Sequence, residues 1–150
     1  MKKDFFILIL AISLFSSCKY EDGPAISFRS FDKRLTGKEW VVENYIIDDC
    51  DSIKLFNDSC GCSYSFYHPG TSEIELRTFK NGQQIGRSSV EIQDKKIVKL
   101  VACTYCNNKG PLCRFDNSYS LIITRLSDDE LWLKTSLDNK NYFIKLKELK

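Results

Sequence analysis

The feature that most constrains the fold of this chain is a series of short segments in which apolar and polar residues alternate, with turn residues between them. Alternation with a period of two is typical of strands with one buried face. Helical periodicity is scarce, and about eight such segments follow one another, which predicts an all-β domain. The predicted strands are 39–47, 61–67, 72–79, 85–92, 96–102, 118–125, 130–136 and 142–149.

The connections between these segments predict a single antiparallel meander. Asn81-Gly82 is a strong hairpin signal because both residues accept a positive φ. Pro69-Gly70, Asp128-Asp129 and Asp138-Asn139 mark further turns. A meander of about eight strands can close into a barrel, which removes its exposed edges. Such a barrel is filled by side chains or holds one small ligand.

Alternation also predicts which side chains point into the barrel. On the first strand, Trp40, Val42 and Ile46 share one side. The possible barrel interior consists of Trp40, Val42, Tyr64, Phe66, Ile74, Leu76, Val90, Ile92, Leu121, Ile123, Leu131, Leu133, Ile144 and Leu146.

The start of the chain has the form of an export signal. A basic beginning is followed by an apolar run over residues 5–15 and by small residues before Cys18. The run is shorter than the ~20 residues that a transmembrane helix needs. Residues 14–18 (LFSSC) resemble a lipobox, in which the cysteine receives a diacylglycerol, the chain is cut before it and the new amine is acylated. We therefore expect a lipid on Cys18; the alternative is an ordinary secreted protein in which Cys18 forms a disulfide.

The residues after Cys18 predict where the protein is located in the cell. Lys19 resembles the residue that follows the cysteine in Gram-negative lipoproteins sorted to the outer membrane, and the acidic residues after it are similar to surface-export tags. We expect an outer-membrane lipoprotein that faces the periplasm or the outside. The expected segments are a signal peptide (1–17), a lipidated tether with an irregular lead-in (18–36) and the barrel (37–150).

The cysteines predict disulfides. The chain has seven, and setting Cys18 aside leaves Cys50, Cys60, Cys62, Cys103, Cys106 and Cys113. An even number in an exported chain is typical of disulfides that pin long loops, although sequence does not select the pairing. Our interpretation is that Cys60 and Cys62, on one face of a strand, bridge into the 103–113 loop. Zinc bound by Cys60, Cys62, Cys103 and Cys106, or a redox role for the C-x-x-C pair, is disfavoured by the compartment and the flanking sequence.

Composition disfavours several classes of function. The chain has 22 basic and 20 acidic residues without a basic stripe, which argues against nucleic-acid binding. The single histidine, His68, lies in a turn with no nucleophile motif. Asp48, Asp49 and Asp51 lack the ligand pattern and glycine of a known calcium loop. We therefore predict a protein that is not an enzyme and that has no metal or cofactor.

Several motifs resemble a known family. Residues 19–24 (KYEDGP), 27–30 (SFRS) and 34–37 (RLTG), followed by Trp40, look like the opening of the lipocalin-like lipoproteins of Gram-negative bacteria. Residues 129–133 (DELWL) are similar to a late strand of that group. At the entry to the first strand, Trp40 follows Gly37 after two residues instead of the one residue of the lipocalin pattern. The resemblance implies a lipocalin-like barrel that binds a small or apolar molecule.

Two functions follow from these observations. The first is a membrane-anchored module that binds a small or apolar ligand in a cavity with apolar walls. The alternative is a protein-interaction module (an inhibitor, an immunity protein or an envelope scaffold) that acts through its cysteine-rich loops, with Tyr105 and Leu112 as contacts. Six aromatic residues could line a pocket or form the core: Trp40, Tyr64, Phe66, Trp132, Tyr142 and Phe143.

Overall fold

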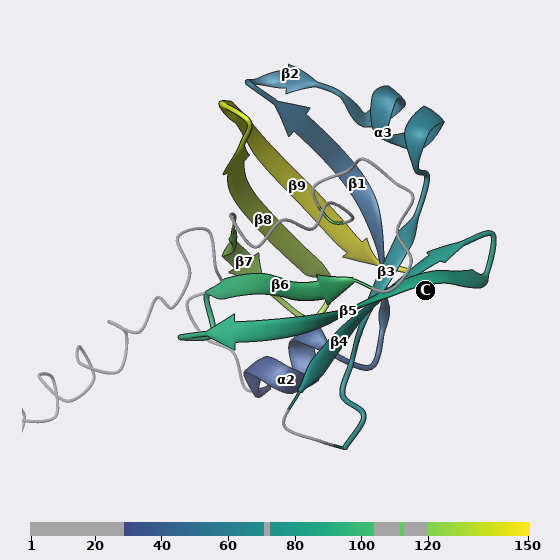
Figure 1. The fold of residues 1–150 in the computed structure, drawn as a ribbon, viewed down its shortest axis with the longest axis vertical. Coiled ribbons are helices and arrows are strands. Elements are labelled where there is room, and N and C mark those ends of the chain that lie inside the picture. Colours follow the sequence, from purple (N-terminus) through teal and green to yellow (C-terminus); the bar gives the residue numbers. More distant parts are fainter. Residues whose placement is uncertain (1–28, 71–72, 104–111, 113–119) are drawn as a thin grey trace, which may run out of the picture.

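In a computed structural model of the chain, which describes residues 29–70, 73–103, 112 and 120–150, the alternating segments form one antiparallel sheet (Figure 1). Two short helices accompany it, α2 (Phe31–Leu35) and α3 (Ile53–Ser59). The strands are β1 (Glu39–Ile47), β2 (Cys50–Asp51), β3 (Ser63–Tyr67), β4 (Ile74–Lys80), β5 (Gln83–Gln93), β6 (Ile97–Cys103), β7 (Leu121–Leu126), β8 (Glu130–Leu137) and β9 (Lys140–Glu148). Among the described residues, no helix combines the length and hydropathy needed to cross a bilayer.

The sheet closes on itself. Its strand order is β1-β3-β4-β5-β6-β7-β8-β9, and β9 pairs again with β1 over seven residue pairs, from Trp40 with Glu148 to Ile47 with Tyr142. The two-residue β2 is an addition that folds back on the end of β1. The predicted all-β fold, an antiparallel meander closed into an eight-stranded barrel, is therefore confirmed; pinning of its loops by disulfides is not shown.

The turns follow the predicted chemistry. Asn81 and Gly82 both have positive φ, at 52° and 74°, and they join β4 to β5 as a tight hairpin. Asp138 and Asn139 join β8 to β9 in the same way, with φ of 52° and 59°. Because such turns match the right-handed twist of strands, they set the register of both hairpins.

Both helices lie in segments for which no regular structure was expected. The lead-in contains α2, which begins after Ser30; the Ser30 hydroxyl accepts a bond from the Lys33 amide at 3.4 Å. The connection between β1 and β3 contains β2 and α3. The predicted strand start at Gly61 is wrong by two residues, because Gly61 has a φ of +56° directly after α3 and the strand begins at Ser63.

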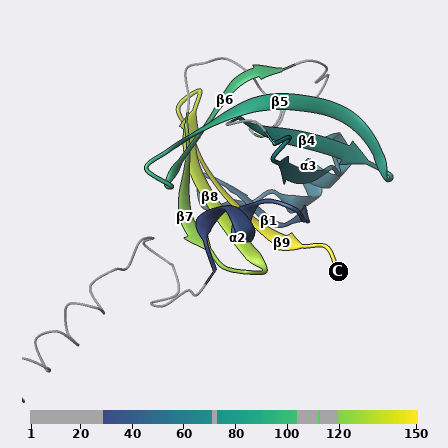
Figure 2. The ribbon, with the colours of Figure 1, turned by 90° about the horizontal axis from the view of Figure 1, so that it is seen from below.

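The helix α2 covers one end of the barrel (Figure 2). Its residues Phe31, Arg34 and Leu35 are buried, and the Gly37 amide donates to the Phe66 carbonyl at 3.3 Å. The turn between β7 and β8 and the start of β1 meet α2 here, so we call this the closed end. The opposite end, which carries β2, α3 and the turn between β8 and β9, is the upper end.

Candidate functional site

The interior of the barrel was the expected ligand site. The side chains predicted to face it belong to one hydrophobic core cluster or pack against it; all are buried except Val42 and Ile92, which are partly buried. Those less than 2% exposed include Trp40, Tyr64, Phe66, Leu76, Leu121, Ile123, Leu131, Leu133, Ile144 and Leu146. An enclosed space large enough for water would leave accessible surface on the side chains around it. Among these described residues the barrel is therefore filled by side chains.

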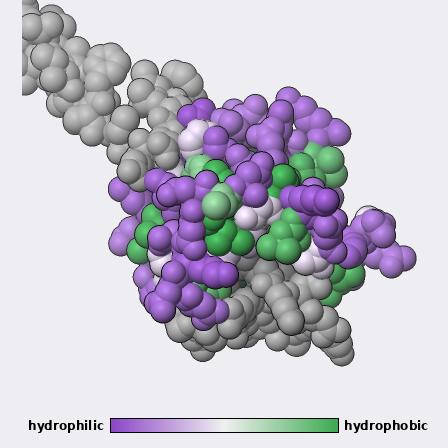
Figure 3. All heavy atoms as spheres, turned by 90° about the horizontal axis from the view of Figure 1, so that it is seen from above, coloured by the Kyte–Doolittle hydropathy of each residue, from purple (hydrophilic) through white to green (hydrophobic). Residues whose placement is uncertain are grey.

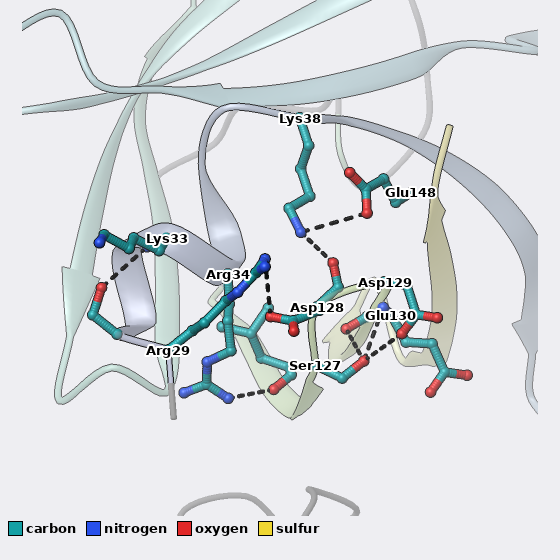
Figure 4. Close-up of polar contacts among 11 residues, drawn as sticks. Arg29, Lys33, Arg34, Lys38, Ser127, Asp128, Asp129, Glu130 and Glu148 are labelled. Carbon is teal, nitrogen blue, oxygen red and sulfur yellow. Dashed lines mark hydrogen bonds and ion pairs between the residues drawn. The ribbon is translucent and has the colours of Figure 1, made fainter. Parts of the chain in front are cut away.

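The closed end is held by polar contacts as well as by packing. The Trp40 indole N–H donates to the Leu35 carbonyl at 3.0 Å, and the buried Arg34 donates through its NH1 group to the Leu126 carbonyl at 2.6 Å. Lys38 donates to the Asp128 carbonyl and lies 3.7 Å from a Glu148 carboxylate oxygen. These bonds join α2, β1 and the β7–β8 turn at one end (Figure 4).

The β7–β8 turn has an internal network of its own. The Glu130 amide donates to the Ser127 hydroxyl at 3.0 Å, and this hydroxyl donates to Asp129 at 3.1 Å. Arg29, where the described chain begins, lies 3.7 Å from Asp128 in the same turn (Figure 4). The chain therefore joins the barrel beside this turn.

On β1, one extra residue changes which side chains face outward. Glu43 has no partner position on β9, because Val42 pairs with Leu146 and Asn44 pairs with Lys145. After this bulge the alternation is inverted. Tyr45 is buried in the core, and Ile46, predicted to point inward with Trp40, lies on the outside instead.

The outward face of β1, β7, β8 and β9 has a groove near the upper end, with a volume of about 500 Å³. We call it the outer groove. Its lining residues are Ile46, Asp49, Ser120, Ile122, Lys134, Thr135, Ser136, Asn141, Tyr142 and Phe143. Seen from the upper end, the described surface shows hydrophobic residues interspersed among hydrophilic ones (Figure 3). The groove combines apolar walls with a few polar groups, as small-molecule sites do.

The face below the groove carries aromatic and basic side chains in alternation. Trp132 and Phe143 meet edge to face, with ring centroids 5.9 Å apart. The Lys145 ammonium lies 4.1 Å from the Trp132 ring centroid, and the Arg125 guanidinium lies 4.9 Å from it. The Lys134 ammonium lies 5.7 Å from the centroid of Phe143. We call these five residues the basic–aromatic face.

The six aromatic residues singled out in the sequence thus separate into two groups. Trp40, Tyr64 and Phe66 are core residues. Phe143 lines the outer groove and Trp132 lies beside it. Tyr142 belongs to both groups, because it lines the groove and also packs against the core, with its ring centroid 6.1 Å from that of Tyr45. The sequence analysis did not identify Lys134 and Ile122 as groove residues. For Lys134 the sequence contained the information: the tight Asp138-Asn139 hairpin places Lys134 opposite Phe143, and both residues alternate with buried ones.

A second depression lies where β4 begins beside the later part of β5, with a volume of about 470 Å³. It is lined by Glu73, Ile74, Ser89, Val90, Glu91, Ile92 and Val101. Its lining includes two carboxylates, whereas the lining of the outer groove includes the ammonium of Lys134, so the outer groove is better suited to an anionic or amphipathic ligand.

The cysteines are only partly described. Cys18, Cys106 and Cys113 lie outside the described residues, and for Cys103 only the backbone, at the end of β6, is described. Cys50 is exposed, whereas Cys60 and Cys62 are buried in the core. None of these three side chains lies at disulfide distance from another of them.

The remaining candidates lie in turns, at the surface or in the core. Asp48 accepts a bond from the Asn141 amide at 2.9 Å, and Asp51 accepts one from the Ile53 amide at 3.0 Å. His68 is exposed after β3. Tyr105 lies outside the described residues, and Leu112, expected as an exposed contact, is 3% exposed and packs in the core. The prediction for Leu112 is wrong because its burial stabilises the core better than exposure would.

Comparison with known proteins gives no assignment: no family model matches the chain, and no curated protein matches it.

Proposed function

We propose that the protein is a lipid-anchored, lipocalin-like binding module of the bacterial outer membrane, and that it holds a small apolar or amphipathic ligand in the outer groove. One contrast carries this proposal. The interior side chains around Trp40 and Leu133 leave almost no accessible surface, whereas the outer groove offers about 500 Å³ between apolar walls. The lipid on Cys18 comes from the lipobox resemblance and would keep the groove at a membrane.

The anchor is tested by the intact mass of the unreduced protein purified from its own membrane in mild detergent. We expect the mass of residues 18–150 plus acyl chains. Loss of six hydrogens relative to the reduced chain would support three disulfides. A mass without acyl chains would overturn the anchor.

The groove is tested by photo-crosslinking in the intact membrane. A benzophenone amino acid replaces Ile122, which lines the groove and is 49% exposed. The matched control replaces Ile85, a strand isoleucine that is 38% exposed and lies outside the groove. We expect a small-molecule adduct at position 122 and none at position 85. A protein adduct at position 122 would support the interaction module instead, and the absence of any adduct there would overturn the groove as a binding site.

A further inference from the structure

Two rows of side chains cross the outside of β7, β8, β9 and β1. Ile122 pairs with Lys134, Lys134 with Phe143, and Phe143 with Ile46. In the neighbouring row, Arg125 pairs with Trp132, Trp132 with Lys145, and Lys145 with Asn44. Cations and aromatic rings are therefore neighbours both along and across the strands.

This face has an excess of positive charge. Arg125 forms an ion pair with Glu130 at 2.7 Å, and Lys147 lies 3.7 Å from Glu43. On the outward side of β7, β8 and β9 the cations Arg125, Lys134, Lys145 and Lys147 outnumber the carboxylate Glu130, and Glu43 is contributed by β1. The ammonium groups of Lys134 and Lys145 lie over the rings, with Lys134 5.7 Å from the Phe143 centroid and Lys145 4.1 Å from the Trp132 centroid.

The outward side of the sheet's other half is different. On β4 and β5, the outward side has two carboxylates and two guanidinium groups, so their charges balance; these residues are Glu75, Glu91, Arg77 and Arg87. Arg77 contacts groups on its own side of the barrel, because its guanidinium lies 3.3 Å from the Glu75 carboxylate and 3.5 Å from the Tyr67 ring centroid. The barrel thus has one electrically balanced side and one basic, aromatic side.

The chain joins the barrel close to the basic side. Arg29 contacts Asp128, and Trp132 follows that residue at the start of β8, about 13 Å along the strand at ~3.3 Å per residue. Residues 18–28 connect this point to Cys18, and an extended chain of that length reaches at most about 40 Å. A lipid on Cys18 therefore holds the basic–aromatic face within reach of the membrane surface.

We infer that the basic–aromatic face lies on an anionic membrane surface, with Lys134, Lys145 and Arg125 over lipid phosphates and Trp132 and Phe143 at the level of the headgroups. Aromatic rings favour this interfacial layer, and each basic side chain near an anionic leaflet contributes about 1 kcal/mol. In this orientation the outer groove opens toward the lipid, so its ligand is an acyl-bearing anion of the membrane. The inference rests on the proposed lipid anchor and deepens the proposed groove function.

The test uses the lipidated protein reconstituted in vesicles of phosphatidylcholine alone or with phosphatidylglycerol. Tryptophan quenching by brominated lipid reports contact of Trp132 with the bilayer, and the variant Trp132→Phe gives the background from the buried Trp40. We expect strong quenching only in the anionic vesicles, and loss of it in salt well above 0.15 M, where screening shortens the Debye length.

The variant Lys134→Gln/Lys145→Gln should reduce the ratio of docked to undocked domains about thirtyfold in the anionic vesicles. The matched control Lys54→Gln/Lys80→Gln removes the same charge from exposed lysines of α3 and β4, and should keep the quenching. Flotation of the vesicles separates the two proposals. Protein that fails to float contradicts the lipid anchor, whereas protein that floats with equal Trp132 quenching in both lipid mixtures overturns the membrane orientation alone.

Discussion

The two tryptophans of the chain lie in opposite kinds of environment. Trp40 is completely buried at the closed end, and its indole N–H is bonded to the Leu35 carbonyl. Trp132 is partly exposed on the outside of β8, between the cations of Arg125 and Lys145. The closed end therefore combines packing with buried hydrogen bonds, whereas the basic–aromatic face leaves apolar and charged groups partly exposed. The four predictions below test this division, in order of decreasing effect.

The largest effect is expected at Trp40. Replacing it with alanine, Trp40→Ala, should reduce the free energy of unfolding by about 3–5 kcal/mol, because a cavity forms in a filled core and the indole bond is lost. The matched variant Trp132→Ala should reduce it by about 1 kcal/mol or less. Urea unfolding of both variants gives the comparison, and equal losses would show that the outer face also belongs to the stabilising core.

The next effect is expected at Arg34. The variant Arg34→Ala removes the donor to the Leu126 carbonyl and the packing of a buried stem, so we expect a loss of about 2 kcal/mol. Arg87→Ala serves as the control, since Arg87 is exposed on β5. A midpoint of denaturation that is the same in both variants would mean that α2 does not depend on this bond.

A smaller effect is expected in the turn at the closed end. In Ser127→Ala the Glu130 amide loses its side-chain acceptor, which should destabilise the protein by about 1 kcal/mol. Ser136→Ala removes an exposed hydroxyl that donates to Asn141 at 2.7 Å beside the outer groove. This variant should destabilise the protein less than Ser127→Ala does. Thermal unfolding ranks the two, and a larger loss at Ser136 would reverse the assigned roles of the two regions.

The smallest effect is expected at Lys145. The variant Lys145→Gln removes contacts with the Trp132 and Phe143 rings but no buried bond, so the unfolding free energy should change by about 0.5 kcal/mol. Emission of Trp132 should nevertheless change, because the cation beside its ring is gone. A loss of stability as large as that of Arg34→Ala would contradict the view that this face is available for binding.

The strands and most of their inward residues could be predicted, because the alternation of apolar and polar residues indicates both directly. The predicted range 39–47 coincides with β1, and Leu131 and Leu133 alternate with outward residues as expected. Tight turns such as Asn81-Gly82 are equally local, since positive φ depends on the residues themselves.

The candidate site could not be predicted in the same way because it depends on irregularities and on pairing between distant strands. The bulge at Glu43 inverts the rest of β1, and a similar shift at Thr124 interrupts β7. Neither bulge has a signature in the sequence. The helices α2 and α3 are five and seven residues long, too short for a periodic pattern, and tertiary packing of Phe31 and Phe56 stabilises them.

The closed end also determines where the protein can be altered. The Leu149 amide donates to the Glu39 carbonyl at 2.8 Å, so the last strand finishes beside the start of β1. A reporter fused after Lys150 would therefore emerge beside the start of β1 at the closed end. The hairpin at Asn81-Gly82 is exposed and does not line the outer groove, so insertion there keeps both termini and the groove undisturbed. An epitope tag that leaves the closed end and the outer groove intact belongs in that turn.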